Sequence, residues 1–267
     1  MPRWWHGYAQ PVHSSGEGGR RPVEAHAVVV GDAQVVVSAV GEVSLAEIVR
    51  AERMIGQVLR RHHVHEPARV RMVERPGAGV TTVQTNVRTG HGEVRTQIDG
   101  SGGWALTFAA ERLDLQLRRA ERSVVRHMPD RRRALLAGVT DDRPVTRRKT
   151  VDVRTCDAAA AIATMDAMDY DAHLFTDAET GEDAIVYWAG PRGVRFARQW
   201  RLRPPRGMDE LPLTMNPHGV PVLAEHQAAA RLCRYGLPFL FCTDIADRRG
   251  RLLYRRYDGD VGVVIAR

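Results

Sequence analysis

The chain has 267 residues, 43% of them hydrophobic, and a formal net charge of +7 at neutral pH. A chain of this length and composition can bury a sizeable core, and we expect it to form two or three small domains. It contains no run of eighteen apolar residues, and its N-terminus, "MPRWWHGYAQPVHSSGEGGRRP", includes no apolar segment of the kind found in signal peptides. These features exclude a membrane-spanning helix and predict a soluble, cytoplasmic protein.

The positive charge is concentrated in the first half of the chain. Residues 1–150 carry 24 Lys and Arg against 16 Asp and Glu, whereas residues 151–267 carry 15 against 16. The first half is therefore +8 and the second half −1, which predicts that the first half binds a polyanion. All of these cations except Lys149 are arginines, an excess that a GC-rich genome would also produce.

The N-terminal segment, residues 1–27, is rich in Gly, Ser, Pro and His and shows no hydrophobic period. We predict a flexible extension there, with Trp4 and Trp5 as its only anchors. A strand is predicted at 33–40. A helix is predicted at about 44–63, where apolar residues recur at helical spacing.

Three further strands are predicted at residues 68–74, 81–89 and 92–99, because apolar and polar residues alternate along each of them. One set of side chains is expected to face the core and the other to face water. The water-facing set includes Arg69, Arg71, Arg88 and Arg95.

A second helix is predicted from about Trp104 to Arg126, with an apolar stripe on one side and arginines on the other. The first half of the chain is therefore predicted to be a βαβββα unit of the α+β class. Two helices would pack on one face of a four-stranded antiparallel sheet and leave arginines on the solvent surfaces.

Residues 30–126 resemble the N-terminal domain of the bacterial hibernation-promoting factors, which has this order of elements and a basic second helix. The most specific piece is "ERLDLQLRR" at 111–119. It is similar to the family's acidic-basic-Leu-x-Arg-Gln-Leu helix, with Leu115 where the family usually has Arg.

The second half of the chain contains an internal repeat. "AAAAIATMDAMDYDAHLFTDAETGEDAIVY" at 158–187 aligns without a gap with "EHQAAARLCRYGLPFLFCTDIADRRGRLLY" at 225–254, so that Ala161 meets Ala228 and Tyr187 meets Tyr254. Such a repeat predicts two copies of one small α/β fold. Each copy should contain a short strand, a helix, a β-hairpin and a closing strand.

The first copy places four acidic residues close together, namely Asp177, Glu179, Glu182 and Asp183. This cluster suggests a cation site, but the second copy has "DIADRRG" at the corresponding place and lacks three of the four acids. We therefore predict a hairpin turn without a metal ion.

The pattern of helix, "HLFTD", turn and "IVY" resembles the C-terminal domain of the long hibernation-promoting factors, as do "VTRRKT" at 145–150 and "YRRYDG" at 254–259. A duplicated C-terminal domain is most similar to the hypoxia- or dormancy-associated factors of mycobacteria. The predicted organisation is an extension at 1–27, a ribosome-binding domain at 28–127, a basic linker at 128–147, and repeats at 148–203 and 210–267.

The resemblance implies a ribosome hibernation factor that inhibits translation under stress or hypoxia, without catalysis and without a cofactor. It would bind the small ribosomal subunit in the channel of mRNA and tRNA near the decoding centre, where arginine suits the rRNA phosphates. The candidate rRNA contacts are Arg112, Arg118, Arg119, Arg122 and Arg126 in the second helix, Arg60, Arg61, Arg69, Arg71, Arg88 and Arg95 on the first helix and the sheet, and Arg131, Arg132, Arg133, Arg147, Arg148 and Lys149 around the linker. A passive tether is the alternative for the linker group.

We also consider the histidines and cysteines as signs of a metal site or an enzyme. His62, His63 and His65 precede Glu66, but adjacent residues at a helix end rarely converge on one ion, and we predict no metal site. Cys156, Cys233 and Cys242 show no CxxC spacing and are predicted to be reduced and buried. No nucleophile-base motif indicates an enzyme. A general RNA-binding or transcription-modulating stress protein is the stronger alternative.

The repeat also predicts how the second half assembles. In the family that the chain resembles, the single C-terminal domain pairs with the same domain of a second ribosome-bound copy. Here both partners lie in one chain, and the short connection between them favours pairing within the chain. Matched apolar positions include Leu174 with Phe241, Ile185 with Leu252 and Val186 with Leu253. We therefore predict an internal pseudo-dimer and single, undimerised ribosomes.

Overall fold

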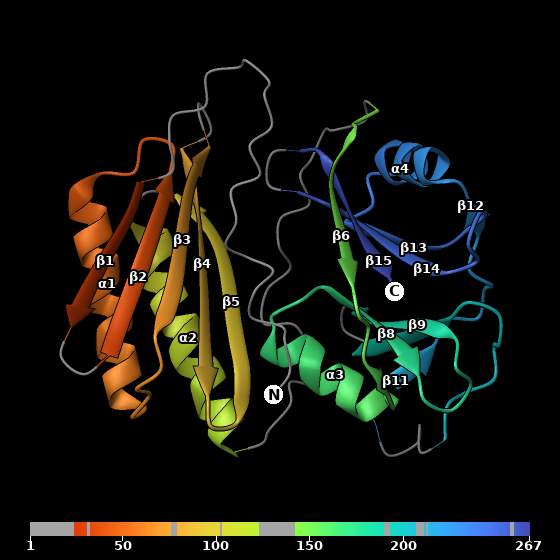
Figure 1. Cartoon of the computed structure of the whole chain (residues 1–267), viewed down its shortest axis with the longest axis horizontal. Helices are drawn as coiled ribbons and strands as arrows, with labels where there is room; N and C mark the ends of the chain where they lie inside the picture. Colours follow the sequence, from red (N-terminus) through yellow and green to blue (C-terminus); the bar gives the residue numbers. More distant parts are fainter. Residues whose placement is uncertain are drawn as a thin grey trace.

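The computed structural model describes residues 24–30, 33–75, 79–101, 103–122, 142–189, 193–206, 211, 213–256 and 259–267. These residues form four helices and three five-stranded sheets. One sheet belongs to an N-terminal unit, and the other two belong to a C-terminal half (Figure 1). Among the described helices, none is both long and apolar enough to cross a membrane.

The N-terminal unit consists of one sheet and two helices, in the order β1, β2, α1, β3, β4, β5, α2. Their bounds are β1 Glu24–Val30, β2 Ala33–Val40, α1 Leu45–Arg61, β3 Ala68–Arg75, β4 Val80–Thr89, β5 Gly92–Ser101 and α2 Trp104–Arg122. Every element predicted from residue 33 onward is present. The prediction of four strands was wrong, because β1 adds a fifth strand at the β2 edge and begins inside the segment predicted as a flexible extension.

The prediction of a wholly antiparallel sheet was also wrong. Strands β2 and β3 pair in parallel, with Val35 beside Ala68 and Val37 beside Val70. The cause is α1, which lies between these strands in the chain, because a helical crossover returns the second strand in the same direction as the first. The remaining pairs, β1 with β2, β3 with β4 and β4 with β5, are antiparallel.

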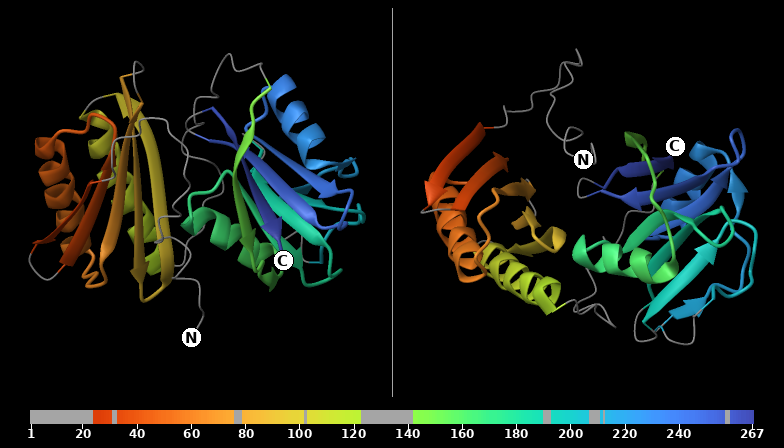
Figure 2. Two further views of the ribbon diagram at one scale, coloured as in Figure 1. Left: turned by 45° about the horizontal axis from the view of Figure 1, so that its top comes forward. Right: turned by 60° about the horizontal axis from the view of Figure 1, so that its bottom comes forward.

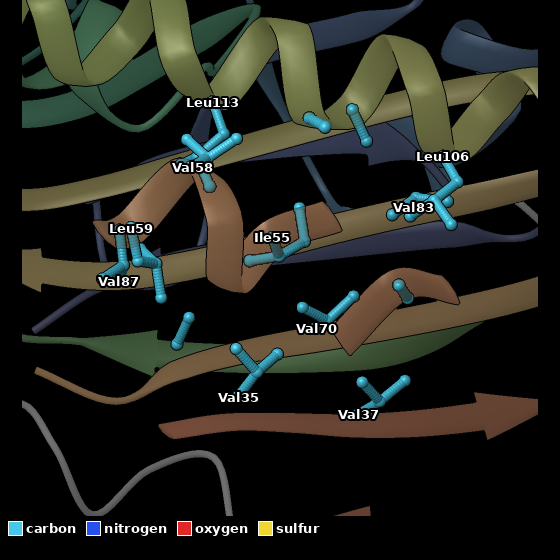
Figure 3. Close-up of a cluster of buried hydrophobic side chains, with 14 of the residues drawn as sticks. Val35, Val37, Ile55, Val58, Leu59, Val70, Val83, Val87, Leu106 and Leu113 are labelled. Atoms are coloured by element: carbon cyan, nitrogen blue, oxygen red, sulfur yellow. The ribbon is translucent and has the colours of Figure 1, made fainter. Parts of the chain in front are cut away.

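Alternation along the strands puts one face of this sheet against both helices. Val35, Val70, Val83 and Val87 are at most 4% exposed. They pack with Ile55, Leu59, Leu106 and Leu113 from the helices in one apolar cluster (Figure 3). Helix α1 begins with a capping box, in which the Ser44 hydroxyl accepts from the Glu47 N–H and the Glu47 carboxylate accepts from the Ser44 N–H.

The C-terminal half contains two sheets with the same plan. The first sheet has the order β11-β10-β9-β8-β7 and the second has the order β12-β13-β14-β15-β6. The bounds are β6 Val145–Val151, β7 Thr155–Cys156, α3 Ala158–Ala167, β8 Ala172–Asp177, β9 Asp183–Trp188, β10 Val194–Arg198, β11 Leu213–Met215, β12 Val222–Leu223, α4 Glu225–Arg234, β13 Phe239–Asp244, β14 Gly250–Arg255 and β15 Val261–Ala266.

The elements of the two sheets recur at the constant offset of the sequence repeat. Helix α3 begins at residue 158 and α4 at residue 225, and β10 begins at 194 and β15 at 261. By the same offset β6 corresponds to β11, yet β6 pairs in parallel with β15 and β11 pairs in parallel with β10. Each repeat therefore contributes its first strand to the sheet that carries the other repeat's helix.

The two C-terminal sheets pack face to face through an apolar cluster, and α3 and α4 cover their outer faces (Figures 1 and 2). Leu174 and Ile185 of the first repeat meet Phe241 and Leu252 of the second in this cluster. These are two of the three matched pairs singled out in the sequence. The third pair serves another purpose, because Val186 lies in the core beneath α3 and Leu253 lies in the core beneath α4.

Polar contacts across this interface also join equivalent positions. Asp183, whose side chain is 3% exposed, accepts from the Gly250 N–H at 2.7 Å and from the Arg249 guanidinium at 2.8 Å. Gly250 is the residue that aligns with Asp183 in the repeat. A Cβ at Gly250 would lie 2.6 Å from the Asp183 Cβ, so the close approach of the two strands requires glycine there.

Candidate nucleic-acid interface

The outer face of the N-terminal sheet carries a band of arginines. The strand register places Arg69 beside Asn86, and Asn86 beside Arg95. Arg69 and Arg88 are exposed, whereas Arg71 is half-buried. Arg88 forms an exposed ion pair with Glu93 at 3.1 Å. The predicted wet face is therefore a polar, cationic surface.

Helix α2 presents two groups of arginines in different surroundings. Arg118 and Arg122 are exposed, and Arg119 is half-buried and donates to the Gln116 side-chain carbonyl at 3.4 Å. The side chain of Arg112 is only 12% exposed and pairs with Asp169 at 2.6 Å. We predicted a solvent-facing Arg112, and the structure instead places it in a contact with the C-terminal half.

A charged network joins the C-terminal end of α1 to the second half of α2. Asp114 accepts from Arg61 at 2.9 Å and from the Nε2 of His62 at 3.0 Å, and it pairs with Arg118 at 2.8 Å. Partial burial alone would raise the pKa of Asp114, but the hydrogen bonds from His62 and Arg61 and the charge of Arg118 hold that pKa below its usual value. The network keeps Arg61 and Arg118 at the shared end of the helices.

The predicted histidine cluster lines a hollow of about 300 Å³ beside this network. His62, His63, His65 and Glu66 contribute to its wall together with His91 from the β4–β5 turn. The ring of His62 is fixed between Asp114 and Glu121, since its Nδ1 lies 2.6 Å from the Glu121 carboxylate. Within the residues that the structure describes, no three His, Cys, Asp or Glu side chains are arranged to hold a metal ion.

Two exposed aromatic side chains lie at the start of α2 and were missed in the sequence. Trp104 is 66% exposed and stacks on Phe108, with ring centroids 6.2 Å apart. On the neighbouring helix Arg50 donates to Thr107 at 3.2 Å. An exposed aromatic pair beside arginine is a surface on which an unpaired base can stack. The sequence could have indicated this pair, because Trp104 and Phe108 are four residues apart in the helix and lie outside its apolar stripe.

The linker group of candidates divides between described and undescribed residues. Arg147, Arg148 and Lys149 lie in β6, so they belong to the second C-terminal sheet and not to a linker. Arg148 pairs with Glu225 at the start of α4, at 2.5 Å. Arg131, Arg132 and Arg133, like Arg126 of the predicted second helix, lie outside the described residues.

The acidic stretch of the first repeat forms the turn between β8 and β9, as predicted, and its carboxylates face arginines and backbone N–H groups. Asp177 and Glu179 bind Arg198, which is 1% exposed, at 2.9 and 2.8 Å. Glu182 accepts from the N–H groups of Trp200 and Arg201. These contacts give each acid a structural role in the fold of the C-terminal half.

The three thiols are buried, as predicted. Burial raises the pKa of the Cys242 thiol to about 12, and burial also raises the pKa of Cys156. A thiol with a raised pKa is a poor nucleophile at neutral pH.

Comparison of the chain with known proteins shows which family its sequence resembles. The sequence model described as "Sigma 54 modulation/S30EA ribosomal protein C terminus" matches residues 140–193. The chain is 46% identical over 234 residues to the "Dormancy associated translation inhibitor" of Mycobacterium tuberculosis, in strains CDC 1551 and H37Rv, covering 84% of this chain and 85% of the relative. The crystal structure of the N-terminal domain of Protein Y from Thermus thermophilus is 21% identical and covers 32% of this chain and 92% of that one, with a TM-score of 0.27.

Proposed function

Because this chain belongs to the long hibernation-promoting factor family, we propose that it is a ribosome hibernation factor that inhibits translation in dormant cells. The 46% identity to a dormancy-associated translation inhibitor, across most of both chains, is the observation that carries this proposal. The mechanism is occupancy of the ribosome, without a chemical step.

The N-terminal unit is the part that binds the small ribosomal subunit, in the channel that mRNA and tRNA use. Its two basic surfaces, the outer sheet face and the last turn of α2, offer guanidinium groups to the phosphates of folded rRNA. The phosphate contacts that we propose within the described residues are Arg60, Arg61, Arg69, Arg71, Arg88, Arg118, Arg119 and Arg122. Trp104 and Phe108 would stack on an unpaired base of the same RNA.

The C-terminal half is an internal pseudo-dimer of two duplicated repeats. The exchanged strands β6 and β11, and the apolar contacts between equivalent positions, have the form of the self-complementary interface of a twofold dimer. Because a repeat of the same chain already covers this surface, a second protein molecule cannot pair there. We therefore propose that the protein silences and protects single ribosomes and does not join them in pairs.

Cosedimentation with purified small subunits tests the ribosomal assignment. We expect about one chain per subunit, with an association constant that falls steeply as salt rises, since each neutralised phosphate releases counterions. A chain that spread over free duplex RNA as readily as over small subunits would instead be a general RNA-binding protein, and the proposal would fail.

A further inference from the structure

The N-terminal unit and the C-terminal half are joined by a contact centred on one carboxylate. Asp169 accepts from the Gln97 backbone N–H at 3.1 Å and from the Arg112 guanidinium at 2.6 Å. The Asp169 side chain is 8% exposed and that of Arg112 is 12% exposed. The carboxylate is thus enclosed between the outer edge of β5 and the flank of α2.

The same short segment of the C-terminal half supplies two further acceptors. The Gln116 side-chain amide donates to the Asp166 carbonyl at 2.6 Å, and Arg95 donates to the Met168 carbonyl at 3.1 Å. These carbonyls lie at the C-terminal end of α3, where a helix presents partial negative charge. Figure 2 shows α3 between the N-terminal unit and the two C-terminal sheets. We call residues 166–170 the docking turn.

The contact is polar, in the manner of reversible contacts between domains. Each apolar cluster of the described residues draws its buried members from one side of this contact only. Arg95 adds a cation–π contact to Tyr170, with its guanidinium carbon 5.3 Å from the ring centroid. A surface held mainly by charge and hydrogen bonds can exchange its partner for another anion.

The donors that hold the docking turn also suit a phosphodiester. The Gln97 backbone N–H and the Arg112 guanidinium bind the Asp169 carboxylate. Beside them, Arg95 and the Gln116 amide donate to backbone carbonyls of the same turn. Carboxylate and phosphodiester groups each carry one negative charge, and guanidinium groups bind both through paired N–H donors. We call these four residues the β5-edge site.

We propose that the β5-edge site binds an rRNA phosphodiester and that Asp169 occupies it in the free protein as an internal competitor. This inference rests on the proposed function and adds a regulatory step to it. The docked state engages Arg95 and Arg112, two of the arginines that the sequence assigns to rRNA. The ribosome must displace the docking turn, so the apparent affinity is reduced by the fraction of molecules that are docked.

The variant Asp169→Asn tests the competition without disturbing the local backbone. Asp169 has a φ of 49°, a left-handed conformation that asparagine tolerates well among the non-glycine residues. Asp142→Asn is the matched control, because it removes the same charge from an exposed position. Binding to purified small subunits is measured for both variants and the parent, and small-angle X-ray scattering of the free proteins reports the separation of the two parts.

We expect Asp169→Asn to bind small subunits roughly tenfold more tightly than Asp142→Asn does, and to have the larger radius of gyration. Equal affinities for the two variants, or weaker binding by Asp169→Asn, would overturn the competition. If the parent and both variants all failed to bind small subunits, the proposed function itself would fall.

A double-mutant cycle identifies the ligand of the β5-edge site. In the parent, Arg112→Gln removes two contacts with opposite effects on affinity: the docking contact, which opposes rRNA binding, and the phosphate contact, which favours it. The net change in affinity should therefore be small. In the Asp169→Asn background only the phosphate contact remains to be lost, and we expect Arg112→Gln to weaken binding about tenfold. No loss in that background would overturn the assignment of a phosphodiester to this site.

Discussion

Replacing Arg119 and Arg122 together with glutamate should abolish inhibition of cell-free translation. Both residues lie in the last turn of α2, and neither faces the apolar core of the N-terminal unit. If each contacts an rRNA phosphate, the two charge-assisted interactions contribute about 1.5 kcal/mol or more each, so their loss weakens binding roughly 100-fold. Charge reversal adds repulsion between the new carboxylates and the phosphates.

Helix α4 provides a matched control for this variant. Arg231 and Arg234 also occupy the last turn of a helix, have the same spacing and are exposed. Glutamate at both positions changes the net charge equally and opposes the helix dipole equally. The α4 variant should inhibit translation as the parent does. If the α2 variant also inhibited fully while both variants kept the parent's melting temperature, the assignment of this surface would be wrong.

Deleting residues 210–267 should convert a monomeric protein into one that self-associates. The deletion removes β11 to β15 and α4, and so uncovers Leu174 and Ile185 on the face of the first C-terminal sheet. It also leaves β6 without β15 and the edge of β10 without β11. Exposed apolar surface and unpaired strand edges both favour association.

The expected product is a homodimer in which each truncated chain inserts its β6 beside β10 of the other. Analytical ultracentrifugation at micromolar protein should show a dimer for the truncated chain and a monomer for the full chain. Adding Leu174→Glu and Ile185→Glu to the truncated chain should restore the monomer, with circular dichroism as the check on folding. A truncated chain that stayed folded and monomeric would contradict the assignment of this pairing surface.

The strands and helices were predictable from residue 33 onward because their hydrophobic periods are clear. Strand β1 was missed because it lies next to a segment rich in Gly, Ser and Pro, which favours no regular structure. The parallel pairing of β2 and β3 follows from the helix between them, and the error lay in applying the alternation pattern without that connection. Alternation indicates which face of a strand is buried, but not the direction of its neighbour.

The exchange of β6 and β11 was not predictable from the repeat. The constant offset between the two copies shows which positions are equivalent, whereas the choice of sheet for each strand depends on contacts between the repeats. For the same reason Val186 and Leu253 were assigned to the pairing surface although each faces its own helix.

The position of Arg112 could not be predicted either. Its partner Asp169 lies 57 residues away in the chain, in the C-terminal half. A basic helix face predicts an anion, but the sequence does not show whether that anion belongs to RNA or to the same chain.

The most direct test of the account is sedimentation of purified ribosomes with a small excess of the full chain through a sucrose gradient. We predict that the protein migrates with single ribosomes and that no peak of ribosome pairs forms, because the pairing surface of the first repeat is already covered by the second. A dominant peak of ribosome pairs that disappears when residues 148–267 are removed would contradict the internal pseudo-dimer.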